Sequence, residues 1–202
     1  MTEQRADARR NWDLLLTAAS AAFAEHGTDA SLRDIARRAG VGIGTLYRHF
    51  PTRDALLKAL LGSRFERLRA RAETLLSSDS PRDALLSWLR ELAAGATTYH
   101  GLPESVLDAL RDEESELYAS CHAMREAAGG LLDRAQEAGT VRADLTTNDL
   151  LALAAGIAWA SERSDRQSAL VVEQLLSVAM YGMAERSGDL AADVTGASVT
   201  GR

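Results

Sequence analysis

The sequence is poor in the residues that cross-link or interrupt a chain. Its single cysteine, Cys121, excludes a disulfide within one chain, and there are only three prolines in 202 residues. The longest apolar run, Leu150–Ala160, is too short to span a bilayer. The first residues, MTEQRADARRNWD, lack the apolar segment of a secretion signal. We therefore expect a cytoplasmic protein with no membrane association.

Runs of β-branched residues are also scarce, whereas alanine, leucine, arginine and glutamate are abundant, which favours an all-α protein. Apolar residues recurring every three to four positions, bounded by glycines and capping residues, predict about nine helices. The expected ranges are 9–25, 31–39, 42–49, 53–76, 81–99, 104–110, 113–138, 148–162 and 167–186. We expect two helical domains, residues 1–55 with a flexible arm at 1–8 and residues 56–186, and a disordered tail at 187–202.

Positive charge is limited and unevenly distributed. The chain carries a net charge of −6, yet residues 1–60 hold nine of the 23 basic residues and only seven of the 29 acidic ones. Within residues 31–58, six basic residues face two acidic ones. An acidic protein with one locally basic segment suits contact with a polyanion through that segment. A solvated basic face of an ordinary helical bundle is the simpler alternative.

The segment GVGIGTLYRHFPTRDALL, residues 40–57, gives that basic region a specific form. Two short helices joined by AGVG are typical of a helix-turn-helix, whose second helix enters the DNA major groove. Leu46 and Phe50 are expected to anchor this helix from beneath. Helical spacing then places four residues on its outer side with a fifth at the edge. These residues are Ile43, Gly44, Tyr47 and Arg48, with Thr45 at the edge.

Each of these residue types suits a DNA contact. Gly44 permits close approach to the base edges, Thr45 can contact a thymine methyl group or a phosphate, and Arg48 can bind guanine through two hydrogen bonds. Phosphate contacts are expected from residues on the same helix and at the starts of the two flanking helices. These residues are Tyr47, His49, Arg53, Ser31 and Arg33. The sequence therefore predicts binding to double-stranded DNA.

About residues 10–60 resemble the DNA-binding domain of the TetR (tetracycline-repressor) family, through AAFAEHG, SLRDIARRAGV and GTLYRHF. The resemblance implies a bacterial, homodimeric, all-helical transcriptional regulator, usually a repressor that leaves a palindromic operator when a small ligand binds. It places Tyr47, His49 and Arg53 on phosphates, and Thr45 and Arg48 at or beside bases. The sequence departs from the family where Gly42 replaces a capping Ser or Thr and where an arginine replaces the commoner lysine at residue 53.

The last two expected helices are apolar beyond the needs of one buried face, which favours a homodimer interface; the alternative is that the two helices simply bury each other. The proposed interface residues are Ala154, Ala155, Ala158, Val171, Leu175, Val178 and Ala179. Between the fourth and seventh helices, seven residues are candidates for the wall of a largely apolar effector pocket, or else plain core. They are Phe65, Trp88, Leu92, Leu107, Tyr118, Cys121 and Met124.

The sequence offers little for other functions. The four histidines are scattered, and Cys121 and His122 are adjacent, so on a helix they point about 100° apart. They match neither a nucleophile–base pair nor the spacing of metal ligands, so we expect no catalytic residues, no metal site and no cofactor. Two alternatives stay open. One is a DNA-binding protein without an effector, and the other is a metal or redox sensor that uses Cys121 and His122.

Overall fold

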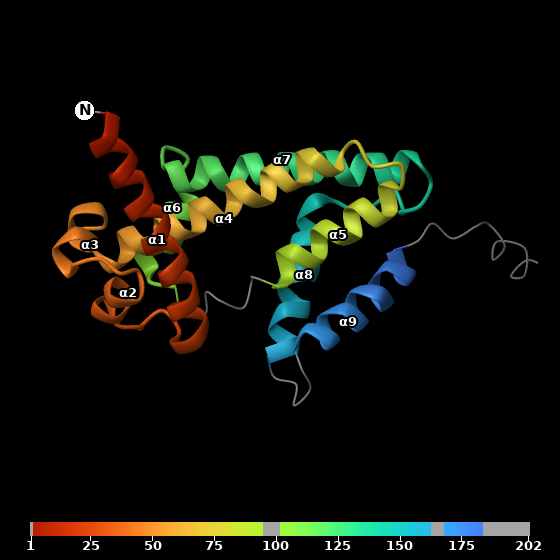
Figure 1. Ribbon diagram of the computed structural model, residues 1–202. Coiled ribbons are helices and arrows are strands. Elements are labelled where there is room, and N and C mark those ends of the chain that lie inside the picture. The colour runs from red at the N-terminus through yellow and green to blue at the C-terminus, as the bar shows by residue number, and fades with distance from the viewer. Residues whose placement is uncertain (1, 95–101, 163–167, 184–202) are drawn as a thin grey trace, which may run out of the picture.

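The computed structural model describes residues 2–94, 102–162 and 168–183, and every regular element in these ranges is an α-helix (Figure 1). The all-α prediction is confirmed. The helices are α1 (Thr2–His26), α2 (Leu32–Arg38), α3 (Ile43–His49), α4 (Arg53–Leu75), α5 (Pro81–Ala94), α6 (Glu104–Arg111), α7 (Glu116–Glu137), α8 (Thr147–Glu162) and α9 (Ser168–Met183). None of them is long and apolar enough to cross a membrane.

The N-terminal helices are bounded by the local signals that the sequence contains. Ser31 caps α2 by accepting a hydrogen bond from the Asp34 amide at 3.3 Å, and Thr52 caps α4 by accepting one from the Ala55 amide at 3.0 Å. Gly40 has a φ of +69°, a left-handed conformation that favours glycine and turns the chain from α2 toward α3. These local signals define the starts of α2 and α4 and the turn between α2 and α3.

Two hydrophobic cores meet along α4. The N-terminal core joins α1–α4 with α6 and the start of α7, and its largest fully buried members are Leu15, Phe23, Ile35, Leu46, Phe50, Leu56 and Leu57. The C-terminal core joins the second half of α4 with α5, α7, α8 and α9. Phe65, near the middle of α4, packs against both cores. Figure 1 shows α4 extending from the N-terminal helices and running beside α7, so α4 is shared by the two cores and links them.

The two glycines within α7 face neighbouring segments at ordinary van der Waals distance. A Cβ atom on Gly129 would meet the Thr147 hydroxyl at 3.4 Å, and one on Gly130 would meet a Leu76 methyl at 3.5 Å. The end of α4 is further fastened because Arg134 donates hydrogen bonds to the carbonyls of Leu76 and Ser78. These contacts tie α7 to the end of α4 and the start of α8.

Some helix boundaries differ from those predicted. Helix α1 begins at Thr2, within the stretch 1–8 expected to be a flexible arm, because Glu, Gln, Arg and Ala sustain a helix without an apolar stripe. Helix α7 begins at Glu116 because Ser115 caps it, accepting a hydrogen bond from the Tyr118 amide at 3.0 Å. The expected end of the fifth helix and the tail 187–202 lie outside the described residues.

Candidate DNA-binding surface

Helix α3 is fixed from its inner side. Leu46 and Phe50 are 0% and 1% exposed, as predicted for its anchors. The Trp12 ring on α1 packs on Phe50 with centroids 4.4 Å apart, and it meets the edge of His49 at 6.0 Å. Aromatic contacts from α1 therefore hold the C-terminal end of α3, and His49 is partly committed to this packing.

The opposite face of α3 is open. Ile43 is 37% exposed and Tyr47 is 49% exposed, while Gly44 and Arg48 are also exposed and Thr45 is half-buried at the edge. Nothing lies within 4 Å of the position that a Gly44 Cβ atom would occupy. The structure thus brings all five predicted residues of the outer face and its edge onto one side of a short, anchored helix.

Arg48 lies back along its own helix. Its Nε donates to the Gly44 carbonyl at 3.3 Å, and its Nη2 donates to the Thr45 hydroxyl at 3.2 Å. Both bonds are long and exposed, so releasing them into water or onto a base requires little free energy. Because Arg48 rests on Thr45, the contacts expected of these two residues are coupled.

Arg53 makes contacts that sequence reasoning did not anticipate. Its Nη1 donates to the carbonyls of Thr28 at 2.8 Å and Ala30 at 2.6 Å, across the turn between α1 and α2. Both of these residues are buried, so their carbonyls have limited access to water. The guanidinium therefore ties the first residue of α4 to the segment that leads into α2.

The basic residues of α2 are unequal. Arg37 pairs with Asp34 at 2.8 Å and Arg38 pairs with Glu25 at 2.7 Å. The hydrogen bond from Arg38 holds the pKa of Glu25 below its usual value. Arg33 is exposed and has no ion pair with any described residue, so its full charge is available to a phosphate.

The dimer prediction needs correction at two positions. Ala154 and Ala158 are 0% and 2% exposed because they are buried within the protomer, so they offer no surface to a partner. Val178 and Ala155 are exposed, whereas Val171, Leu175 and Ala179 are half-buried. Sequence reasoning did not single out the large exposed apolar side chains on the same two helices, although it noted that both helices are apolar beyond the needs of one buried face. They are Trp159 at 54%, Leu170 at 65% and Tyr181 at 79% exposed.

The predicted pocket residues separate into groups. Trp88 is 0% exposed, and its Nε1–H donates a hydrogen bond to the Leu68 carbonyl at 2.9 Å. It therefore belongs to the core rather than to a cavity wall. Met124 is buried in the same core, whose edge is formed in part by the half-buried Phe65 and Leu92. Leu107 is half-buried on α6.

Tyr118 and Cys121 do lie together, in a pocket of about 350 Å³ that also includes His122, Arg125 and Glu126. Burial raises the pKa of the Cys121 thiol, which lowers the reactive thiolate fraction at neutral pH. His122 faces Glu126 at 3.6 Å. Within the described residues, no group of three or more histidine, cysteine or carboxylate side chains is placed to hold a metal ion.

Sequence reasoning also missed a buried cation. Arg64 is 8% exposed on α4, and its Nη2 donates to the Leu92 carbonyl of α5 at 2.6 Å. The available signal was its position, four residues after Leu60 and four before Leu68, on the apolar face of α4.

Both halves of the chain match known protein families. The model of "Bacterial regulatory proteins, tetR family" matches residues 15–60, and that of "Transcriptional regulator SbtR-like, C-terminal domain" matches residues 80–185. The crystal structure of the TetR transcriptional regulator SCO0520 from Streptomyces coelicolor is 38% identical, with a TM-score of 0.69, over 86% of this chain and 98% of that one.

Two curated relatives differ in how much they share. The transcriptional repressor KstR2 from Rhodococcus jostii is 28% identical over 84% of this chain and 89% of its own length. The transcriptional regulator SAR0097 from Staphylococcus aureus is 33% identical over 39% of this chain, and the match spans only 42% of that protein.

Proposed function

The chain belongs to the TetR family of bacterial transcriptional regulators, and we propose that it represses transcription as a homodimer bound to a palindromic operator. The observation that carries this proposal is the outer face of α3, exposed over its length while Leu46 and Phe50 fix the helix from beneath. An anchored helix with an open polar face is what major-groove recognition requires. The KstR2 relative is named as a repressor, which favours repression over activation.

We assign the DNA contacts by position on this face. Arg48 binds guanine, and Thr45 contacts a thymine methyl group or a phosphate, while Gly44 lets the helix approach. Tyr47 and the start of α2, through Ser31 and Arg33, contact phosphates and set the register. Arg53 acts chiefly from behind this surface, because its guanidinium already binds two backbone carbonyls.

The homodimer would form through α8 and α9. Trp159, Leu170, Val178 and Tyr181 are each more than half exposed in the single chain, which leaves a large apolar surface open to water. Burying such a surface against a second copy contributes about 25 cal/mol per Å² of apolar area. A two-fold interface pairs each helix with its copy and presents two α3 helices to a two-fold symmetric operator.

We further propose that a small, largely apolar effector binds among the C-terminal helices and weakens operator binding. Support comes from the continuity of α4, which packs in the C-terminal core and begins at Arg53, beside the α1–α2 turn. A ligand that shifts the second half of α4 would therefore also move the N-terminal helices. Such a ligand acts only in so far as it binds the two positions of α4 unequally.

The test is an unbiased selection from random duplexes with the purified full chain at moderate ionic strength, followed by binding titrations on the enriched sequence. We expect two-fold symmetric half-sites spaced by about one helical turn, or a multiple of it. Arg142→Ala is a control for loss of an arginine outside the DNA-binding surface. Arg142 is exposed, pairs with Asp144 and lies far along the sequence from α3, so this variant should bind the enriched DNA as the wild type does. Failure to enrich any sequence would overturn the proposal. Enrichment with no response to a library of apolar compounds would leave a DNA-binding protein without an effector.

A further inference from the structure

A groove of about 430 Å³ lies between α1 and α4, outside the surface assigned to DNA. Its volume is within the roughly 300–1,000 Å³ typical of small-ligand pockets. Helix α1 contributes six lining residues and α4 contributes three, so the groove bridges the two helices. They are Asp13, Leu16, Thr17, Ser20, Ala21 and Ala24 from α1, and Leu60, Ser63 and Arg67 from α4.

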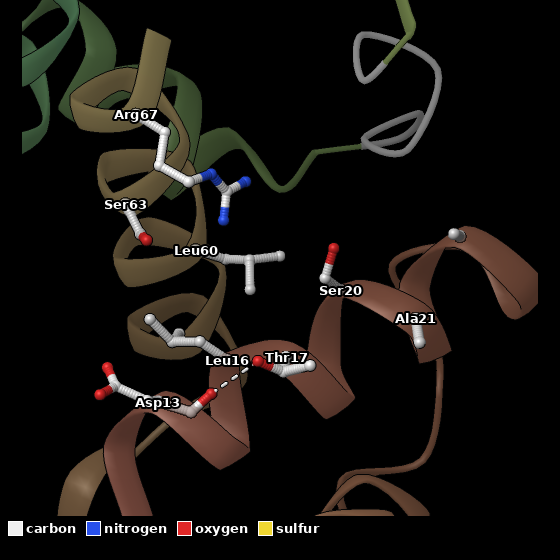
Figure 2. A pocket seen from close by; sticks show the side chains of 9 residues that line it. Asp13, Leu16, Thr17, Ser20, Ala21, Leu60, Ser63 and Arg67 are labelled. Carbon is white, nitrogen blue, oxygen red and sulfur yellow. Dashed lines mark hydrogen bonds between the residues drawn. The ribbon is translucent and has the colours of Figure 1, made fainter. Parts of the chain in front are cut away.

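Three polar side chains of this groove lie toward one part of it. Figure 2 shows the Arg67 guanidinium extending from α4 into the space above Leu60, between Ser63 on α4 and Ser20 on α1. Arg67 has no ion pair or hydrogen bond with any described residue, although Arg69 and Arg71 on the same helix are both paired with glutamates. An unpaired guanidinium in a groove that also holds two serine hydroxyls is suited to a carboxylate, which accepts two parallel hydrogen bonds from arginine.

The remaining lining is largely apolar. Leu16 and Leu60 form part of the groove wall but are nearly buried, at 9% and 4% exposed, whereas Ala21 and Ala24 are exposed and offer apolar surface to a ligand. Asp13, near the middle of α1, is at the N-terminal end of the groove's α1 wall, and its negative charge repels an anion. This polarity would direct the carboxylate of a ligand to Arg67 and its uncharged chain along the exposed alanines.

We propose that the groove between α1 and α4 binds small aliphatic carboxylates, with the anion on Arg67, Ser20 and Ser63 and the hydrocarbon chain beside Ala21 and Ala24. This site is separate from the effector pocket proposed for the C-terminal helices. Its occupant contacts α1, which holds α3 through Trp12, and α4, which holds the α1–α2 turn through Arg53. Binding here therefore fixes two helices that position the DNA-binding surface.

The test measures binding of pentanoate and octanoate to the full chain without DNA, by calorimetry and by the amide resonances of α1 and α4. We expect octanoate to bind more tightly than pentanoate, with shifted resonances in both helices. Octanamide tests the contribution of the negative charge to binding, and inorganic phosphate tests the contribution of the hydrocarbon chain. Each should bind at least about tenfold more weakly, because one lacks the charge and the other lacks the chain.

Two variants and one control localise the site. Arg67→Gln removes the charge, and Ala21→Leu fills the groove at an exposed helical position without changing any charge. Each should weaken octanoate binding at least about tenfold. Arg71→Gln removes the same charge one turn away, where the arginine pairs with Glu91, and should leave affinity within about twofold. Octanoate binding that is equal in all four proteins, or no saturable binding, would overturn the site.

A second readout concerns coupling to DNA, and this part rests on the proposed function. If octanoate changes operator affinity, Arg67→Gln should abolish that change while leaving operator affinity itself intact, because the variant no longer binds octanoate in the groove. A protein that binds octanoate in the groove but never binds DNA would contradict the regulatory function and not the site. If operator affinity is the same with and without bound octanoate, only the proposed coupling to DNA binding is contradicted.

Discussion

Replacing Arg53 by alanine distinguishes a structural role from a phosphate-binding role for the same guanidinium. Its Nη1 makes two hydrogen bonds, to the carbonyls of Thr28 and Ala30, that join α4 to the turn between α1 and α2. Alanine would leave both carbonyls without this donor, in residues that are 8% and 4% exposed. We therefore expect loss of stability together with loss of operator affinity, rather than loss of operator affinity alone.

The magnitude follows from the two bonds. A hydrogen bond that involves a charged group contributes about 1.5–3 kcal/mol net. The two bonds share one nitrogen and are not additive, so we expect Arg53→Ala to lower the free energy of unfolding by about 2–3 kcal/mol. For a chain of this length, that corresponds to a fall in Tm of roughly 4–12 °C.

The assay combines denaturant unfolding, at one fixed protomer concentration, with operator titrations over a range of salt concentrations. The structural role predicts a lower unfolding midpoint and an unchanged slope of log K against log salt. Arg33→Ala is the control, because Arg33 is exposed on α2 and is assigned to a phosphate. Its removal should leave the free energy of unfolding unchanged and reduce the slope of log K against log salt by about 0.9 per protomer. Unchanged stability and a reduced slope for Arg53→Ala would refute the structural role and indicate that Arg53 contacts a DNA phosphate.

Three further predictions concern other parts of the molecule. Arg48→Ala should cost about 1–3 kcal/mol per half-site and relax the preference at one base pair, as measured by selection; equal losses on all sequences would show a phosphate contact instead. Val178→Glu should convert a dimer into monomers in sedimentation experiments, whereas Leu14→Glu, 41% exposed on α1, should not; a monomeric wild type would contradict the interface. Hydrogen bonds from Thr146 hold the pKa of Asp149 below its usual value, so this carboxylate stabilises the fold fully above about pH 4 and progressively less as the pH falls through its lowered folded-state pKa. Asp149→Asn should flatten that acid-side loss in unfolding measurements, and an unchanged acid profile would argue against the contribution.

Most of the candidate DNA-binding surface could be predicted from the sequence because its determinants are local. The spacing of Leu46 and Phe50 sets which side of α3 is buried, and the remaining positions of that helix must then face outward. The role of Arg53 could not be predicted in this way. Its carbonyl partners lie 25 and 23 residues earlier in the chain, and no local pattern links them.

The C-terminal half shows the same division more strongly. The apolar content of α8 and α9 pointed to an interface, but a helix that is apolar beyond one buried face does not reveal which side its own neighbours cover. Packing against the rest of the protomer buried Ala154 and Ala158 and left Trp159 exposed. Trp88 is likewise buried in the core, where its indole N–H donates a hydrogen bond to the Leu68 carbonyl on another helix.

The sequence by itself determined the helices, the family and the outward face of α3, because caps, glycine turns and apolar spacing act within a few residues. The tertiary structure alone decided which arginines are available. Arg53 and Arg64 reach backbone carbonyls on other segments, Arg38 pairs with Glu25, and Arg67 is left to face a groove. A long cationic side chain has the same local pattern whether it meets a carbonyl, a carboxylate or water, and only the packed neighbours distinguish these outcomes.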